Sequence, residues 1–238
     1  MSSQHTVIVG GSSGIGLATA RHLLASCARV TITGRNQTRL AEAKRQLGPE
    51  AQAVPMDAAA ADALRARFAQ IGSFDHLVLA VGSGKGVGPF ATVSLADVKL
   101  GFEEKVYAHF AAAQAALPFL NPTGSLTFIS AVSAQAAVPG TAGIGAANAA
   151  IAAIVPILAV ELKPLRVNGI SPGVIDTPWW DAFPEEQKQA MFGDYAAKTP
   201  VGRVGQPEDV AQAITFLIGD SLISGHMLVC DGGLRLSV

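Results

Sequence analysis

The chain has 238 residues, of which 50% are hydrophobic and 15% charged, against about 25% charged in a typical soluble domain. This length suits one large domain with a sizeable core, and the abundance of aliphatic residues excludes a disordered chain. The 17 basic and 18 acidic residues give a net charge of −1, which argues against nucleic-acid binding through a basic surface.

Short apolar strands alternate with helical patterns along the chain. The expected strands are 5–9, 30–33, 53–56, 76–80, 125–129, 166–170 and 226–229. The expected helices are 15–26, 37–47, 59–70, 95–101, 102–117, 144–162, 185–197 and 207–217. Uniformly apolar strands are typical of a parallel sheet that helices cover on both faces. The sequence therefore predicts an α/β fold, a Rossmann-type doubly wound parallel sheet of about seven strands, in a single domain over residues 1–238.

No Asp, Glu, Lys or Arg occurs between Lys105 and Glu161. Within this stretch, residues 142–160 are long enough to cross a bilayer as a helix. The presence of Asn148 and Pro156, the many alanines and the lack of a basic N-terminal flank favour a buried helix instead. We therefore expect no membrane contact.

The remaining signals of cellular location are few. The first residues lack the cationic region and long apolar run of a signal peptide. Two cysteines, Cys27 and Cys230, form neither a disulfide framework nor a metal site. We expect a cytoplasmic protein with free thiols and no bound metal.

A glycine-rich turn stands where the first expected strand meets the first expected helix. Glycines permit a tight turn and let the backbone approach a pyrophosphate, whose charge is held by N–H groups at the helix N-terminus. Such a turn alone is a weak signal, but its position in a strand–turn–helix unit strengthens the prediction of a dinucleotide site. The expected contacts are Gly10, Ser12, Ser13, Gly14, Ile15 and Gly16.

The second expected strand is followed by Gly34 and Arg35. Proteins that select NAD usually place an acidic residue there to bond the ribose hydroxyls. Arg35 instead offers a guanidinium suited to bidentate contact with a 2′-phosphate, and Asn36 and Ser13 are placed to add hydrogen bonds. The alternative is a solvated surface arginine. This position predicts NADP(H) as the cofactor.

Four motifs, in order and at the expected separations, resemble those of the short-chain dehydrogenases/reductases. They are VGGSSGIG (9–16), with Val9 where Thr is usual, LVLAVG (77–82) in place of a variant of NNAG, RVNGISPGVIDTP (166–178), and PVGRVGQPEDVA (200–211) followed by DGG (231–233). The resemblance covers essentially the whole chain. It implies a nicotinamide cofactor and a small-molecule substrate.

The resemblance also implies further cofactor contacts. Asp57 would bond the adenine amino group, and Thr177 would lie near the nicotinamide carboxamide. The other implied contacts are Pro172, Gly173 and Ile175 at the nicotinamide, with Ala80, Val81 and Gly82 after the fourth strand. Pro-Gly turns after strands are common structural features, but their spacing from the preceding Val-Asn pair favours the functional role.

Four side chains that the family's chemistry uses are missing. The family employs a Tyr acid, a Lys four residues later that binds ribose and lowers the Tyr pKa, a Ser thirteen residues before the Tyr, and an Asn on an earlier helix. Aligning AANAAI (146–151) with the family's ASKAAx fills these positions with Ile144, Asn148, Ala131 and Lys105, respectively. No alignment slip restores the pattern, because neither Tyr107 nor Tyr195 begins a YxxxK.

Lys105 offers a compensation for the lysine that is missing at position 148. We hypothesise that it reaches the nicotinamide ribose or the substrate from the other side, while Asn148 fills the vacated space. His109 is one helical turn further on the same face and is the candidate proton donor. Ser130, next to the family's Ser position, is a third catalytic candidate, although adjacent strand residues point to opposite faces. The alternative is a solvated Lys105 and a His109 that packs at a subunit interface.

Aromatic residues gather in the segment of about residues 178–200, which in the family is a mobile lid over the substrate. They are Trp179, Trp180, Phe183, Phe192 and Tyr195, with Met191 among them. The cluster indicates an apolar or aromatic ligand or, equally, a hydrophobic cap or an oligomer contact. Tyr195 is a remote candidate for a replacement acid.

Three functions fit these features. The first is an NADP(H)-dependent oxidoreductase with altered proton-transfer residues, acting on a small apolar or aromatic carbonyl or imine; an already protonated iminium would tolerate the loss of the Tyr. The second is an NADP(H)-binding sensor or scaffold without turnover, and the third a non-redox enzyme. The small-residue faces of helices 102–117 and 144–162, by the resemblance, predict a homodimer or homotetramer.

Overall fold

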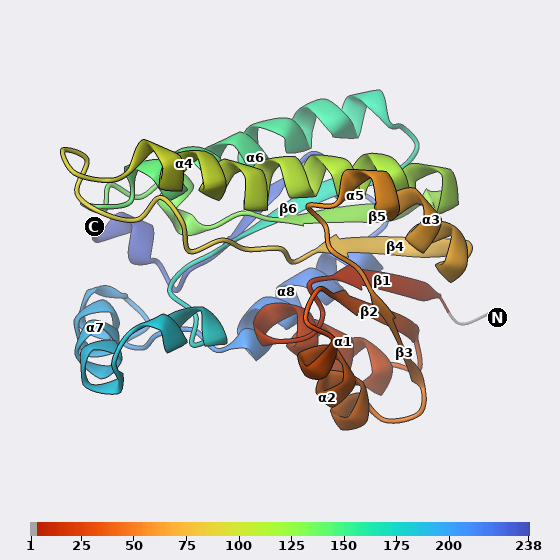
Figure 1. The fold of residues 1–238 in the computed structure, drawn as a ribbon, viewed down its shortest axis with the longest axis horizontal. Helices are drawn as coiled ribbons and strands as arrows, with labels where there is room; N and C mark the ends of the chain where they lie inside the picture. The colour runs from red at the N-terminus through yellow and green to blue at the C-terminus, as the bar shows by residue number, and fades with distance from the viewer. Residues whose placement is uncertain (1–3) are drawn as a thin grey trace.

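Seven parallel strands form one sheet in the order β3-β2-β1-β4-β5-β6-β7 in a computed structural model that describes residues 4–238 (Figure 1). The strands are β1 (His5–Val9), β2 (Arg29–Gly34), β3 (Ala51–Pro55), β4 (Phe74–Leu79), β5 (Leu120–Ile129), β6 (Arg166–Pro172) and β7 (Met227–Cys230). This topology confirms the predicted doubly wound α/β fold.

Helices cover both faces of the sheet. They are α1 (Gly14–Ala25), α2 (Gln37–Leu47), α3 (Ala61–Ile71), α4 (Leu95–Phe102), α5 (Ala108–Ala116), α6 (Ala142–Glu161), α7 (Glu185–Lys198) and α8 (Pro207–Gly219). In Figure 1, α3 to α6 lie on one side of the sheet and α1, α2 and α8 on the other. Alternate residues of β1 feed a core on each side, since Val7 and Val9 pack in one cluster and Ile8 in the other.

The helix that carries Lys105 departs from the prediction. The sequence predicts a break between helices 95–101 and 102–117, but α4 continues into α5 through a π-helical turn, η1 (Glu103–Tyr107). A π-turn holds one more residue per turn than an α-helix needs, and such turns are frequent at functional sites. The π-turn therefore widens the helix backbone at Glu104 and Lys105.

The long apolar helix α6 is less buried than predicted. By length and composition it is able to cross a bilayer, as core and interface helices of non-membrane proteins also are, and only 22% of its most apolar window is buried. One face packs on β5, β6 and η1, while Ile157 and Val160 are 60% and 73% exposed. The expectation of a buried helix is thus wrong for the isolated chain.

Three of the alanines expected to form an external face on α5 lie inside instead. Ala108, Ala112 and Ala116 are buried in the core beneath the helix. The neighbouring exposed side chains are aromatic, Tyr107 and Phe110. The outer surface of this region is therefore larger and more apolar than a smooth alanine face.

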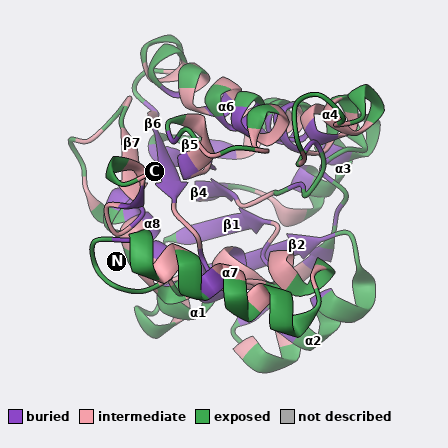
Figure 2. Ribbon diagram, turned by 90° about the vertical axis from the view of Figure 1, so that its left-hand side faces the viewer, coloured by how far each residue is buried: buried purple, intermediate pink, exposed green. Residues whose placement is uncertain are grey.

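The segment after β6 stands apart from the sheet. It forms a short 3₁₀ helix, η4 (Pro178–Ala182), and then α7, which lies in front of the carboxyl ends of the strands in Figure 2 with a largely exposed outer face. Its one buried aromatic side chain is Phe192, which faces inward. These elements contain the residues of the expected lid, about 178–200, and lie at the carboxyl-end edge of the sheet.

Candidate cofactor and substrate site

The glycine turn lies where the strand order reverses. The chain runs from β1 to β2 and β3 on one side and returns to β4 on the other, so a crevice opens outside the carboxyl ends of β1 and β4. At Gly10, φ is +85° and a Cβ atom would lie 2.5 Å from the Ala80 carbonyl oxygen. A Cβ at Gly16 would collide with the Gly10 carbonyl. Only glycine permits this close packing of the turn, α1 and β4.

The first turn of α1 keeps its hydrogen-bonding capacity for a ligand. Ser13 occupies the N-cap position in an extended conformation, and its side chain makes no capping hydrogen bond. The N-terminal N–H groups of the helix therefore remain free to bind a pyrophosphate. This is the cradle that a dinucleotide requires, and the residues fit that group.

The expected adenosine end comes together beside this turn. A Cβ at Gly34 would lie 2.9 Å from the Ser12 hydroxyl, so the end of β2 and the glycine turn are in contact. Arg35, the next residue, is exposed and forms no ion pair among residues 4–238. Asn36 uses its carbonyl oxygen to cap α2 by accepting from the Arg39 N–H at 2.9 Å, which leaves only its amide NH₂ for a phosphate.

Asp57 is also exposed near this end. Its Oδ1 accepts a hydrogen bond from the Ala59 N–H at 3.0 Å, an Asx-type turn that fixes the carboxylate. The second carboxylate oxygen has no partner among the hydrogen bonds of residues 4–238. The geometry leaves that oxygen available for the implied contact with an adenine amino group.

The expected nicotinamide end follows β6. A Cβ at Gly14 would lie 3.3 Å from Thr177, so the residues after β6 rest on the start of α1. Gly173 packs so closely on Asp231 that a Cβ would lie 2.8 Å from the Asp231 Cα. Ile175 is buried and pairs with Gly205, which places much of its side chain in the core rather than in the crevice.

Lys105 is buried in η1, with 6% of its surface exposed. Its Nζ donates to the Ser130 carbonyl oxygen at 3.4 Å, its one hydrogen-bond partner among residues 4–238. Burial lowers the pKa of Lys105 to about 8. The alternative of a solvated lysine is therefore excluded, and two of the three ammonium donors remain for a ligand.

His109 does not suit the predicted role of proton donor. It is fully buried and stacked on Phe128, with ring centroids 5.9 Å apart. Its Nδ1 lies 2.7 Å from the Lys105 carbonyl oxygen and its Nε2 3.1 Å from the Leu79 carbonyl oxygen. Burial, and then the Lys105 charge, lower the pKa of His109 to about 3. The ring is neutral at pH 7 and links η1 to β4, which corrects the prediction.

Ser130 and Asn148 meet behind Lys105. The Ser130 hydroxyl donates to the Asn148 backbone oxygen at 2.8 Å, so it is engaged with α6 rather than with a substrate. Asn148 is buried, as predicted for a residue that fills the vacated space, and its Nδ2 donates to the Ser133 hydroxyl at 3.0 Å. Its Oδ1 has no hydrogen-bond partner among residues 4–238. Ser133 was missed by sequence reasoning, because no spacing rule points to it.

A second polar group on η1 was also missed. Glu104 is half-buried, and its Oε2 accepts a hydrogen bond from the Ser83 hydroxyl at 2.7 Å. The Ser83 carbonyl oxygen in turn accepts from Trp179 Nε1 at 3.1 Å. The sequence signal that could have identified Glu104 is the pair of acidic residues before Lys105. Such a pair is also typical of an ordinary solvated helix face.

The remaining lid aromatics pack mainly on one another. Trp180 lies at the centre of the cluster, with Phe192 at 5.3 Å and Tyr195 at 6.3 Å between ring centroids. Its Nε1 donates to the Ile175 carbonyl oxygen at 3.0 Å. The structure thus makes most of the cluster a hydrophobic cap, and Trp179 is the aromatic that reaches the site through Ser83.

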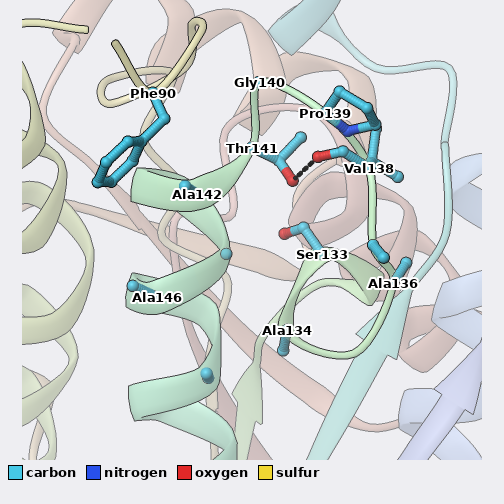
Figure 3. Close-up of a pocket in the computed structure, with 13 residues that line it drawn as sticks. Phe90, Ser133, Ala134, Ala136, Val138, Pro139, Gly140, Thr141, Ala142 and Ala146 are labelled. Atoms are coloured by element: carbon cyan, nitrogen blue, oxygen red, sulfur yellow. Dashed lines mark hydrogen bonds between the residues drawn. The ribbon is translucent and has the colours of Figure 1, made fainter.

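A groove of about 510 Å³ opens beside Ser133 (Figure 3). It is walled by the β5–α6 connection and the first turns of α6, and Phe90 stands across it from the loop. Thr141 donates to the Val138 carbonyl oxygen at 2.7 Å and shapes the loop. The groove is apolar and open, which suits the non-reacting part of an apolar ligand.

The strand order and the glycine turn define a dinucleotide-binding domain of the Rossmann type. A family profile described as enoyl-(acyl carrier protein) reductase matches residues 9–235. The short-chain dehydrogenase/reductase ATR9 of Stachybotrys chlorohalonatus is 30% identical and covers 97% of this chain and 96% of its own. The chain belongs to the short-chain dehydrogenase/reductase family.

Two solved structures are similar over nearly the whole chain. A small-chain dehydrogenase in complex with NADPH has a TM-score of 0.86 and 32% identity, covering 98% of this chain and 99% of its own. The MalC reductase/Diels-Alderase from Malbranchea aurantiaca has a TM-score of 0.87 and 25% identity, covering 98% and 96%.

Proposed function

We propose that the protein is an NADP(H)-dependent oxidoreductase that acts on a small apolar or aromatic carbonyl or imine with proton-transfer groups unlike those usual in its family. The exposed Arg35 at the end of β2, beside the glycine turn, carries the cofactor assignment. The similar dehydrogenase described in complex with NADPH supports it.

Each part of the cofactor has residues that would hold it. The N–H groups at the start of α1 would bind the pyrophosphate, Arg35 the 2′-phosphate, and Asp57 the adenine. Thr177 would contact the nicotinamide carboxamide. When bound, the nicotinamide supplies or accepts the hydride.

Lys105 is the proposed substitute for the family's lysine. Its ammonium, buried at the carboxyl end of β5, has donors to spare for the ribose hydroxyls or the substrate. The Ser130 hydroxyl and the His109 ring are both occupied by backbone groups, so neither is poised to protonate a substrate. A substrate that needs no proton donor, such as an iminium, suits this site better than a ketone.

A cofactor titration tests the assignment. We expect wild-type protein to bind NADPH at least about tenfold more tightly than NADH, since a charge-assisted hydrogen bond contributes roughly 1.5–3 kcal/mol. Arg35→Asp should lose this preference. Arg29→Asp, at the opposite end of the same strand, is the matched control and should retain it. Equal or tighter binding of NADH by the wild type, or an unchanged NADPH affinity in Arg35→Asp, contradicts the proposal.

A second candidate is a non-redox reaction on the same scaffold. One similar structure is described as a reductase/Diels-Alderase, and the groove beside Ser133 offers an apolar surface for such chemistry. This candidate predicts product formation without oxidation of NADPH. The third possibility, a sensor or scaffold, predicts NADPH binding with no product.

Thiols and exposed apolar side chains support proposals for the location and assembly of the protein. We propose a cytoplasmic location, where the free thiols of Cys27 and Cys230 would stay reduced. We further propose a homodimer or homotetramer, because apolar side chains such as Ile157 and Val160 are exposed along α6.

A further inference from the structure

Ser83 is the junction of a hydrogen-bonded group beside the Lys105 site. Its hydroxyl donates to Glu104 Oε2 at 2.7 Å and accepts from the Lys85 N–H at 3.0 Å. Its carbonyl oxygen accepts from Trp179 Nε1 at 3.1 Å. Ser83 is buried, so Glu104 and Trp179 are both held at a fixed point of the loop after β4.

This group joins the segments that follow the two strands on either side of β5. Ser83 follows β4 and Trp179 follows β6, while β5 lies between these strands. Just after β5, Ser130 accepts the Lys105 hydrogen bond. A Cβ at Gly84 would lie 3.6 Å from Trp179 Nε1, so the indole rests against the loop backbone. Glu104 and Trp179 are thus both bonded to Ser83, the first through the Ser83 hydroxyl and the second through the Ser83 carbonyl oxygen.

Glu104 is a carboxylate without a cation. Among residues 4–238 it forms no ion pair, whereas its neighbour Glu103 pairs with Lys99 at 3.7 Å. Lys105 does not neutralise it, because the π-turn directs Lys105 to Ser130 and Glu104 to Ser83. A half-buried, hydroxyl-bonded carboxylate is favourable only if its charge is solvated or paired. A cationic ligand would supply the counter-charge that Glu104 lacks among residues 4–238.

We propose that Glu104 and Trp179 bind a positively charged nitrogen of the substrate, an iminium or protonated imine. This inference rests on the proposed oxidoreductase function and narrows its substrate class. A carboxylate and an indole face are the two protein groups that attract an organic cation most strongly. Glu104 would set the substrate's charge in place, and Trp179 would cover it.

The chemistry balances without a proton donor. A bound NADPH would supply the hydride, with its nicotinamide C4–H bond broken and the cofactor oxidised to NADP⁺. The hydride would form a bond to the iminium carbon, and the C=N π pair would move onto nitrogen, where it neutralises the positive charge. The product is an uncharged amine. No group has to protonate the product during this step, which accounts for a site in which the Tyr position is occupied by Ile144 and the nearby hydroxyl and imidazole are engaged elsewhere.

Binding, measured apart from turnover, tests the proposal. The probes are N-methyldihydroisoquinolinium, a permanent iminium cation, and methyldihydronaphthalene of the same shape without the charge. Isothermal titration with NADP⁺ present, so that no hydride is available, should show the cation binding about tenfold more tightly than the neutral probe. Glu104→Gln should bring the two affinities within about twofold, because the amide keeps the shape and removes the charge.

Glu103→Gln is the matched control, a neighbouring carboxylate that points to Lys99, and should retain the preference for the cation. The NADPH affinity of each variant reports correct folding, and titrations repeated without cofactor separate this inference from the proposed function. The inference is overturned if the wild type binds both probes equally, fails to bind the cation at millimolar concentration, or keeps its preference in Glu104→Gln. NADPH binding in that case would leave the proposed function standing.

Discussion

Burial gives Lys105 an electrostatic cost. An amine buried without a carboxylate partner is destabilising while it is charged, and burial lowers the pKa of Lys105 to about 8 for the same reason. An aliphatic side chain would pack at this position with less penalty. Under the proposed function, binding of the ammonium to cofactor or substrate explains this buried charge better than stability does.

The variant Lys105→Met separates these two roles. We expect it to be about 1–3 kcal/mol more stable than wild type at pH 7, because it removes the buried charge. The folded-state pKa lies below the ordinary value of 10.5, so the unfolded chain binds more protons between about pH 8 and 10.5 and wild-type stability gains over that range. Urea unfolding at pH 7 and pH 10 should therefore show the difference between the two proteins narrowing.

The same variant should bind NADPH at least about tenfold more weakly at pH 7, from the loss of a charge-assisted hydrogen bond. Wild-type affinity should fall above pH 8 as the free amine deprotonates, while the affinity of Lys105→Met should not follow that change. If Lys105→Met is less stable than wild type and binds NADPH with wild-type affinity, Lys105 contributes only to packing and the predicted role in cofactor binding is wrong.

At the scale of helices and strands, the sequence predicts where an element begins and ends better than it predicts irregular turns within a helix. β1 and α2 begin and end at the expected residues, because strand-like apolar runs and a capped polar helix are local signals. The π-turn η1 is not predictable in this way, since the neighbouring His109 ring lies between the Lys105 carbonyl oxygen of η1 and the Leu79 carbonyl oxygen of β4, a tertiary contact that no local pattern encodes. The sequence therefore does not predict that Glu104 bonds Ser83 while the adjacent Lys105 bonds Ser130.

The outer face of α6 is apolar but only partly covered in the single chain. Its missing charges predict burial, yet only 22% of its most apolar window is buried in the single chain. An uncharged sequence indicates that a helix face is buried from water. It does not indicate whether the same chain or a second copy of the chain buries that face. A second copy of the chain would satisfy both observations.

This interpretation predicts self-association through α6. Light scattering at micromolar concentration should give a dimer or tetramer for wild type, and Ile157→Glu should shift it toward the monomer by placing a charge in the interface. Val201→Glu, on a residue of similar exposure (61%) outside α6, is the control and should leave the assembly unchanged. A monomeric wild type would contradict the prediction.

For the whole molecule, the order of the sequence motifs predicts the fold and the place of the cofactor crevice. It does not predict which side chains meet at the proposed substrate site. Gly10 and Gly16 are predictable because a Cβ at either position would collide with backbone, at Gly10 with the Ala80 carbonyl after β4 and at Gly16 with the Gly10 carbonyl. Ser83 and Trp179 come together from loops almost one hundred positions apart, as the separation of 96 residues shows, and no local pattern encodes that contact. Lys105 is buried and bonded to the Ser130 carbonyl oxygen, and its catalytic role stays a prediction, whereas the buried His109 ring between two backbone carbonyls does not suit the role of proton donor.

We propose that this chain transfers hydride between NADP(H) and an imine-type substrate. The most direct measurement mixes wild-type protein and NADPH with matched ketones, imines and iminium ions, and follows the absorbance of the reduced nicotinamide together with product formation. We predict oxidation of NADPH with the iminium ions and imines in preference to the ketones. NADPH bound but never oxidised across the series, or product formed without oxidation, would contradict the account.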